Sequence, residues 1–371
     1  MNSPDARVSA DELGALVDVV QANCHIADAC HAADLPLCIY LLQMREFFRW
    51  ERRLDFGTEL NREAVGQWLL EREGLWSEVE ACPLRPLPFS GRLFDPQDAD
   101  ALNAELVPLG LVYGAGITAV DRPTYFLAQL HRVEMRDDGL QLQVGGRELA
   151  RGLFAPPAAL ANGRTIVLRR ESLGRWLWEK FEAFSLRRIE GPFKALVDAY
   201  SLHNSEAFVM ALPRLVDDQC ETLLLHELGE HRAGQWLEPG WSAMRLALSQ
   251  RRTEMHLRAV RDHIADLEVT LPTLLARGAD ASLHFWFANY DGVRAQMFPS
   301  LVRGYAAWCN GDLGATLLRS SQVGSAHFRK LAEAVLKLHG DFGEYACARI
   351  DRLLASPSSI CNPANVASAT G

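Results

Sequence analysis

The segment 226–231, which reads His-Glu-Leu-Gly-Glu-His, carries the most concentrated chemistry of the sequence. On a helix, His226 and Glu230 share one face, because side chains four residues apart lie one above the other. Ligands at this spacing hold the zinc ion of His-Glu-x-x-His proteases. Here Glu230 stands where that pattern has its second histidine, and His231 follows one residue late. The spacing therefore indicates a metal site, but not a standard zinc protease.

Histidines and carboxylates recur on the next predicted helix, where Asp266 lies one turn from His263. We predict helices over 217–237 and 247–269 with a short proline–glycine connection between them, and neighbours joined in this way usually pack antiparallel. The two polar sets then converge, as in helical bundles that bind non-haem iron or manganese, although the Glu-x-x-His pairs of such sites are missing. The predicted metal ligands are His226, Glu227, Glu230, His263 and Asp266.

These ligands suit one or two divalent ions of iron, manganese or zinc. An open coordination position would support oxidation or hydrolysis of a small molecule, with Glu227 as a further ligand or a proton carrier. A shared ion needs His226 and His263 close together, since a His–metal bond is only about 2.0–2.1 Å long for zinc. The alternative is a non-enzymatic binding or assembly protein in which nearby arginines form salt-bridge networks with the acids. Those arginines are Arg232, Arg258 and Arg261.

A second candidate lies near the N-terminus, where Cys24, Asp28 and His31 fall on one stripe of a helix predicted over 10–32. A thiolate, a carboxylate and an imidazole in such a row are able to hold a soft metal ion. The plainer interpretation is a packed cysteine next to a hydrogen-bonded histidine. The sequence leaves both interpretations of this stripe open.

Composition limits the class of protein. The chain has 371 residues, a formal net charge of −9 and 49% hydrophobic residues, which is typical of a folded protein. Nucleic-acid binders usually carry a basic excess, so we expect no nucleic-acid partner. The chain shows no basic–apolar leader and no apolar run of the ~18 residues that a membrane span needs, so we expect no membrane partner. Eight cysteines without a Cys-x-x-Cys pair favour reduced thiols and a cytoplasmic protein.

The order of helical and strand-like patterns predicts an α+β fold, with a mostly helical body (a helical bundle) and a small central β-rich module. The prolines between 82 and 88 indicate an extended linker at the first junction. Both helical segments are expected to form one body, into which the β-rich module is inserted. The expected parts are an N-terminal helical segment over 1–82, the β-rich module over 83–170, a C-terminal helical domain over 171–355 and a disordered tail over 356–371.

Strands in the β-rich module are predicted at 109–117, 124–135, 140–144 and 165–170. Residues 137–139, which read Asp-Asp-Gly, form a strong turn signal, so the second and third strands are expected to form a hairpin. Gly145 and Gly146 predict a further turn after the third strand.

Several short segments of the sequence, taken together and in this order, carry a resemblance: residues 37–46 with Trp50 and Glu51, then 155–157, 169–172, 225–230 and 261–266. In these segments the chain resembles a family of uncharacterised bacterial cytoplasmic proteins of about this length. The likeness spans roughly residues 24–310 and implies one protein of conserved length, not a chance fusion. It carries over no activity and no catalytic residue.

Overall fold

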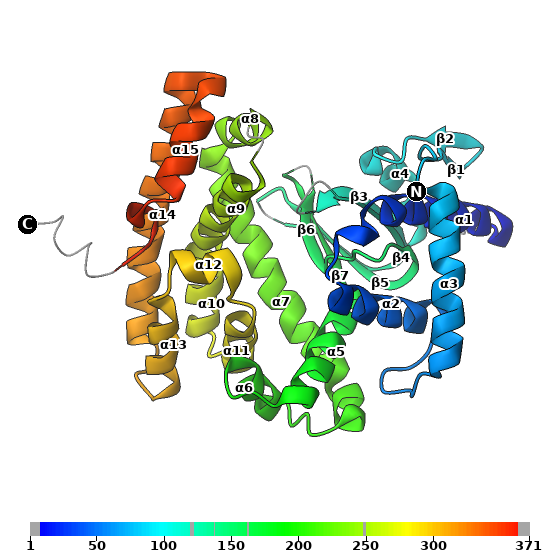
Figure 1. Cartoon of the computed structure of the whole chain (residues 1–371), viewed down its shortest axis with the longest axis horizontal. Coiled ribbons are helices and arrows are strands. Elements are labelled where there is room, and N and C mark those ends of the chain that lie inside the picture. The colour runs from blue at the N-terminus through cyan, green and yellow to red at the C-terminus, as the bar shows by residue number, and fades with distance from the viewer. Residues whose placement is uncertain (1–7, 119–121, 137, 162, 248–249, 363–371) are drawn as a thin grey trace, which may run out of the picture. The chain divides into compact units, whose positions relative to one another are not determined.

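A computed structural model describes residues 8–118, 122–136, 138–161, 163–247 and 250–362 (Figure 1). Helices dominate these residues, together with one five-stranded sheet, which confirms the predicted α+β class. The chain divides into two compact units. The first takes in the described residues up to Leu186 together with Asn204–Val216, and the second takes in Arg187–His203 and the described residues from Asp217 onward.

The first unit contains N-terminal helices, a short two-stranded hairpin and the larger sheet. The N-terminal helices therefore belong with the sheet, and the expectation of one helical body built from both chain ends is wrong. The elements in chain order are α1 (Ala10–His31), η1 (Ala32–Asp34), α2 (Leu37–Glu51), α3 (Arg62–Val79), β1 (Leu87–Phe89), β2 (Arg92–Phe94), α4 (Ala99–Leu106), η2 (Val107–Leu109), β3 (Leu111–Thr118), β4 (Arg122–Met135), β5 (Gln141–Arg151), β6 (Ala158–Ala161), β7 (Thr165–Arg169) and α5 (Arg170–Arg187).

The larger sheet has the strand order β3-β4-β5-β7-β6. Strands β4 and β5 are antiparallel and Met135 pairs with Gln141, which confirms the predicted hairpin. Asp137, part of the turn signal, lies outside the described residues. Register shifts between Leu127 and Arg132 interrupt the β4–β5 ladder, and irregularities of this kind bend a strand pair. Strand β7 then pairs parallel to β5 and antiparallel to β6, which completes a curled sheet.

The prediction of a turn at Gly145 and Gly146 is wrong, because both residues lie inside β5. Gly145 pairs with Leu130 on one side and Arg169 on the other. A Cβ at Gly145 would lie 3.4 Å from the Cβ of Ala128, which is ordinary van der Waals contact, so a side chain of one carbon fits at this strand position. Strands β1, β2 and β6 were not predicted, since strands of three or four residues show too few alternations to be recognised.

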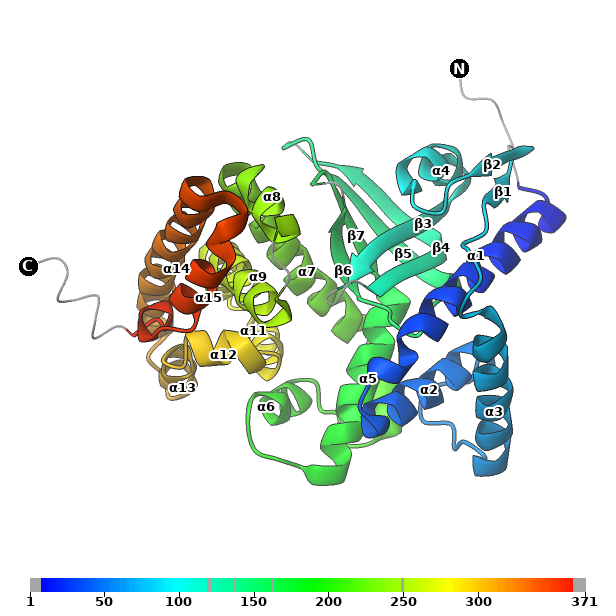
Figure 2. The ribbon, with the colours of Figure 1, turned by 45° about the horizontal axis from the view of Figure 1, so that its top comes forward.

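Helix α1 covers one face of the sheet. Ser9 caps the helix, because its side-chain oxygen accepts the N–H of Glu12 at 3.1 Å. Further along, Leu16, Val20 and Cys24 are buried against the sheet, and Figure 2 shows the helix beside β4. Burying each large apolar side chain contributes about 1.5–3 kcal/mol, so this interface is a main source of stability for the first unit.

The second unit contains helices and no strand within its described residues. Helix α7 is shared, since its residues up to Val216 belong to the first unit and the remainder to the second. The elements are α6 (Pro192–Ala199), α7 (Ser205–Leu237), α8 (Gly240–Ala247), α9 (Arg251–Ala265), η3 (Asp266–Thr270), α10 (Leu271–Ala276), α11 (Asp280–Ala288), α12 (Gly292–Met297), α13 (Leu301–Cys309), α14 (Ala315–Phe342), η4 (Gly343–Ala346), α15 (Cys347–Leu354) and η5 (Pro357–Ser359).

The two helices predicted to carry the site have other bounds than expected. Helix α7 starts twelve residues before the predicted 217 and contains Pro213. The predicted helix over 247–269 is divided: α9 ends at Ala265, and η3 continues it as a π-helical turn. The expectation of a disordered tail fails for its first residues, because Cys361 is buried and its N–H donates to the carbonyl of Met297 at 2.8 Å.

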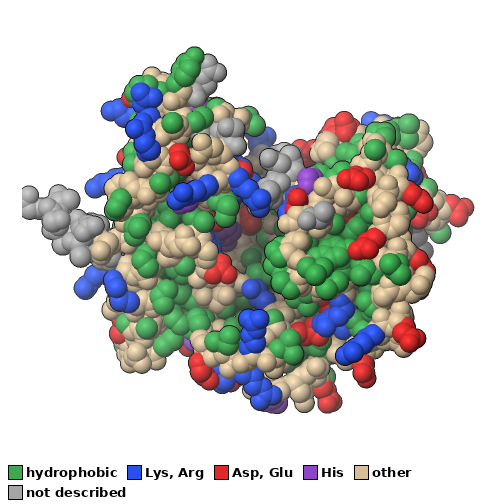
Figure 3. All heavy atoms as spheres, viewed as in Figure 1, with side chains coloured by type: hydrophobic (Ala, Val, Ile, Leu, Met, Phe, Trp, Pro, Cys, Tyr) green, Lys and Arg blue, Asp and Glu red, His purple; other side chains and the backbone are tan. Residues whose placement is uncertain are grey.

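The surface in Figure 3 carries acidic and basic side chains intermingled with apolar ones. No helix within the described residues combines the length and apolar character needed to cross a membrane. All eight cysteines are free thiols.

Candidate metal centre

A close contact between α7 and α9 brings the polar side chains of the second unit together. Gly229 lies at this contact: a Cβ added to it would come within 2.5 Å of the carbonyl oxygen of Ala265. Only glycine allows the two backbones to approach so closely. His226 and Glu230 flank Gly229 on α7, and Asp262 lies one turn before Ala265 on α9, so side chains from both helices reach one small volume.

His226 is held by a chain of hydrogen bonds. Its Nδ1 lies 2.8 Å from Oδ1 of Asp266, and since a carboxylate only accepts, the Nδ1–H donates. The other oxygen of Asp266 accepts from Arg294 at 3.0 Å, and Arg294 also donates to the carbonyl of Asn289 at 2.9 Å. Asp266 is buried, with a side chain only 1% exposed. These hydrogen bonds therefore fix the orientation of the imidazole and keep a proton on its Nδ1.

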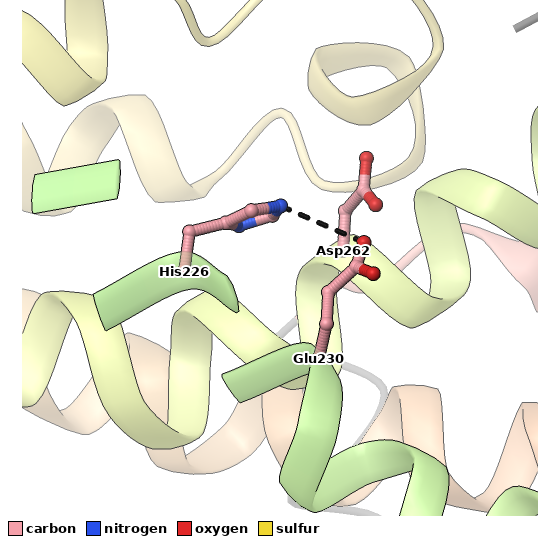
Figure 4. Close-up of side chains that lie close together, drawn as sticks. All are labelled: His226, Glu230 and Asp262. Atoms are coloured by element: carbon pink, nitrogen blue, oxygen red, sulfur yellow. Dashed lines mark ion pairs between the residues drawn. The ribbon is translucent and has the colours of Figure 1, made fainter. Parts of the chain in front are cut away.

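The other imidazole nitrogen faces two carboxylates. Figure 4 shows the ring of His226 pointing toward Glu230, with Asp262 beside it. His226 Nε2 lies 3.6 Å from Oε1 of Glu230, which is too long for a hydrogen bond. One ligand atom from each of these three residues lies within 4.8 Å of the others. All three side chains are partly exposed, so solvent reaches this space.

Charges in the cluster separate the carboxyl groups into two kinds. Burial alone would raise the pKa of Asp266 and Glu230, but His226 and an arginine near each hold both at about 2. Burial raises the pKa of Glu227 to about 7 and that of Asp262 to about 6, helped in each case by the negative charge of Glu230. These two carboxyl groups therefore hold their protons to higher pH than free carboxyl groups do, because the available positive charge does not neutralise all four acids.

The pKa of His226 moves in the opposite direction. Burial lowers it, but Asp266 and then Glu230 outweigh burial and raise it well above its usual range. The Asp262 carboxyl also shares a hydrogen bond with Glu230. A proton thus occupies the space between imidazole and carboxylates, where another cation would find the same ligands.

The π-helical turn η3 begins at Asp266, directly where this residue binds His226. π-Helical turns inside α-helices are rare, and they occur frequently at functional sites. The altered turn changes the direction in which residues after Ala265 project. Glu268, in the same turn, points elsewhere and pairs with Arg329 and Ser325.

The structure does not bring His263 to the cluster. Its ring stacks on Phe328 with centroids 4.1 Å apart, and its Nε2 lies 3.1 Å from the carbonyl oxygen of Arg294. Burial, and next the charge of Arg294, lower the pKa of His263 to about 3, so the ring is neutral. A neutral ring donates from Nε2 to that carbonyl. His263 is therefore a packed residue next to the cluster and not a member of it.

The salt-bridge network of the alternative interpretation is formed in part, because two of its arginines pair with acids on these helices. Arg261 lies 3.2 Å from Glu230, whereas Arg258 pairs with Glu254 at 2.7 Å, away from the cluster. Arg294, which the sequence analysis did not consider, holds Asp266. The cluster therefore contains both an arginine-paired part, with Asp266 and one oxygen of Glu230, and a part without an arginine contact, around His226 Nε2.

The N-terminal stripe of Cys24, Asp28 and His31 is divided among separate partners. The Cys24 thiol donates to the carbonyl of Tyr125 at 3.2 Å, and Asp28 accepts the N–H of Leu153 at 2.8 Å. His31 lies 3.5 Å from Asp34 of η1. These contacts support the plainer interpretation, in which each polar group is satisfied by its own neighbour.

Comparison with known families covers nearly the whole chain. The N-terminal domain model of a family of unknown function (DUF6866) matches residues 15–169, and the C-terminal domain model of the same family matches residues 174–357. The chain belongs to this uncharacterised family. Searches of curated proteins and of solved structures gave no match. The geometry of the cluster is therefore the main guide to function.

Proposed function

We propose that the second unit binds a divalent first-row metal ion through His226 Nε2, Glu230 and Asp262. The observation that carries this proposal is the pairing of the opposite imidazole nitrogen with the buried Asp266. Histidines that bind metals almost always donate their second N–H to a carboxylate or carbonyl, which fixes the tautomer that leaves a lone pair for the metal. His226 has this arrangement and directs Nε2 at two carboxylates, where a metal ion would replace the proton that Nε2 carries.

Charge supports the same conclusion. Glu227, Glu230, Asp262 and Asp266 face two arginines, Arg261 and Arg294, so two negative charges are left over when His226 is neutral and every acid ionised. A divalent cation balances those two charges and lowers the raised pKa of Glu227 and of Asp262. Buried like charges without such a cation are costly.

One imidazole and two carboxylates suit manganese, iron or zinc and leave coordination positions open. A metal ion in such a site lowers the pKa of bound water and polarises an oxygen of a small-molecule substrate, which serves hydrolysis or oxidation. Glu227, with a pKa near 7, is suited to take up and release a proton at the same pH. We propose a cytoplasmic metalloenzyme, and the eight free thiols support a reducing compartment.

The competing function is a purely structural network, favoured by the Arg261–Glu230 and Arg294–Asp266 pairs. Thermal melting of untagged protein separates the two. Manganese, zinc or, without oxygen, ferrous iron should raise the melting temperature, because binding at 100 times the dissociation constant adds about 2.7 kcal/mol to stability. Asp262→Asn should remove this rise.

Glu254→Gln is the matched control, since Glu254 lies on the same helix and pairs with Arg245 and Arg258 outside the cluster. It should keep the full metal response. If none of the three metals shifts the wild-type melting curve, or if Asp262→Asn responds like Glu254→Gln, the cluster is a structural network.

A further inference from the structure

A pocket of about 580 Å³ lies in the first unit, next to the loop that joins α2 to α3. Residues 53–56 of this loop form one part of its lining, and Gly146 and Arg147 of β5 form another. Helices α5 and α7 complete the lining, and the α7 residues end at Val216, the last residue of α7 in the first unit. Small-molecule pockets of this size usually combine an apolar surface with a few polar groups, and this pocket has both.

The apolar part of the lining includes Leu54, Phe56 and Leu212. All three residues are only partly buried, so each keeps apolar surface within reach of a ligand. The ring of Phe56 packs against Trp178 and Phe208, with ring centroids 5.6 and 6.3 Å away, which holds it in place. An apolar body on a ligand would remove this remaining surface from water, and such burial is favourable.

The loop is held in its shape before any ligand arrives. Arg49 is 2% exposed, and its Nη1 donates to the carbonyl oxygens of Asp55 and Thr58, each at 2.9 Å. The N–H of Leu54 donates to the carbonyl oxygen of Arg49 at 3.0 Å. Arg53 has a φ of 55°, in the left-handed region that residues other than glycine rarely adopt. Such conformations cluster at ligand sites and persist where the surroundings hold them.

Arg53 and Arg147 bring two accessible positive charges to this pocket. The Nη2 of Arg53 donates to the carbonyl oxygen of Glu148 at 2.9 Å, and its side chain is 37% exposed. Arg147 is exposed, and its side chain forms no hydrogen bond or ion pair with any residue that the structure describes. Burial lowers the pKa of Arg53, Glu171 opposes this effect, and the like charge of Arg147 lowers the pKa further. The two guanidinium groups therefore repel each other, and an anion between them would relieve the repulsion.

Glu171, the acid nearest to Arg53, is committed to other donors. Its carboxylate accepts the N–H of Glu148 at 2.6 Å and a guanidinium N–H of Arg175 at 2.8 Å. Arg53 lies 3.8 Å from the same carboxylate, which is too long for a hydrogen bond. Both accessible arginines therefore keep donors for a ligand.

The other charged groups near the pocket do not cancel this positive charge. Without Arg170, which has interactions of its own, three arginines and two acids line the pocket: Arg53, Arg147, Arg175, Asp55 and Glu171. The layer next to this lining contains two arginines and three acids, namely Arg151, Arg169, Glu148, Asp28 and Glu179. Burial raises the pKa of Asp28 and of Glu179 to about 7, so this second layer lies close to neutrality. An excess of about one positive charge remains at the pocket, which favours an anionic ligand.

We propose that this pocket binds a small organic anion with an apolar body. The carboxylate or phosphate head of the ligand contacts Arg53 and Arg147, because guanidinium groups match the planar or forked oxygens of both heads. The apolar body packs on Leu54, Phe56 and Leu212. The site is independent of the metal centre in the second unit, since every residue that lines it belongs to the first.

The test uses the full chain and defined probes in isothermal titration calorimetry. Benzoate and phenyl phosphate carry the same ring with either head, benzyl alcohol carries the ring without a charge, and acetate and inorganic phosphate carry the heads without a ring. We expect at least one of the two ring anions to bind saturably, and the one that binds more tightly identifies the head group. Benzyl alcohol and the matching ringless anion should bind at least about tenfold more weakly, because charge-assisted pairs and apolar burial both contribute.

Arg147→Gln removes an exposed charge that has no partner among the described residues, so the fold should be kept. It should weaken the ring anion at least about tenfold and leave benzyl alcohol unchanged. The control is Arg92→Gln, which removes the same charge from an exposed pair with Glu105 on β2, outside the pocket lining, and should keep the affinity.

The proposal is overturned if neither ring anion binds at up to about 10 mM, well above the millimolar range expected of weak small ligands. Equal binding of benzyl alcohol and the ring anions overturns it as well, and so does equal binding of the ringless anions. Unchanged affinity in Arg147→Gln, or an equal loss in Arg92→Gln, has the same consequence.

Discussion

Replacing Gly229 by alanine tests the contact that assembles the metal centre. The new Cβ would lie 2.5 Å from the carbonyl oxygen of Ala265 and 2.8 Å from its carbonyl carbon and Cα. All three are backbone atoms, so no side chain can turn aside and α7 must move away from α9. Overpacking of this kind costs about 1–3 kcal/mol.

The control is Gly234→Ala on the same helix, where a Cβ meets nothing within 4 Å. Both substitutions gain the same helix propensity, about 0.8–1.0 kcal/mol. The difference between them therefore isolates the overpacking, and we expect Gly229→Ala to be less stable than Gly234→Ala by about 1–3 kcal/mol in urea denaturation. Equal stability of the two variants would refute the close approach of α7 and α9.

Four further results are expected. In excess chelator, stability should fall as pH rises from about 4.5 to 8, because the folded pKa of Glu227 lies near 7, above its unfolded value, so its contribution is present at low pH and lost through pH 7. Glu227→Gln should flatten this part of the pH profile, and a profile unchanged by the substitution would contradict the assignment. Glu148→Gln should cost about 3–5 kcal/mol in urea denaturation, because it leaves the buried Arg169 without a counter-charge. Glu105→Gln, at the exposed pair with Arg92, should change stability by less than about 1 kcal/mol, and similar losses for both would be inconsistent with this account.

The sequence predicted the elements with strong local signals. The cap at Ser9 and the apolar spacing after it define α1, and the turn residues near Gly139 define the β4–β5 hairpin. Local signals do not show which other helix or sheet packs against the apolar face of each element. The sequence analysis therefore assigned α1 to one body with the C-terminal helices, whereas the structure packs α1 on the sheet of the first unit.

The candidate site shows the same limit. His226 and Glu230 were chosen by their spacing, and both lie in the cluster. On the second helix we chose His263 instead of Asp262, its neighbour in sequence, which points about 100° away around the helix. The imidazole of His263 packs instead on the ring of Phe328, which is distant in sequence.

A signal for the correct face was available. Gly229 and Ala265 are small residues set beside the two polar pairs, and small residues facing one another indicate where helices approach closely. Asp262 and Asp266 flank Ala265 on that face. Arg294 had no comparable signal, because it reaches Asp266 from a six-residue helix whose position depends on the whole unit.

The metal content of untagged protein tests the central claim most directly. Wild-type protein and the variants Asp262→Asn and Glu254→Gln would be loaded with manganese, zinc and, without oxygen, ferrous iron, desalted, and measured by elemental analysis. The proposed centre predicts stoichiometric retention of at least one of these metals by wild type and Glu254→Gln, with loss in Asp262→Asn. Metal-free wild-type protein after all three loadings, or equal retention by Asp262→Asn, would contradict it.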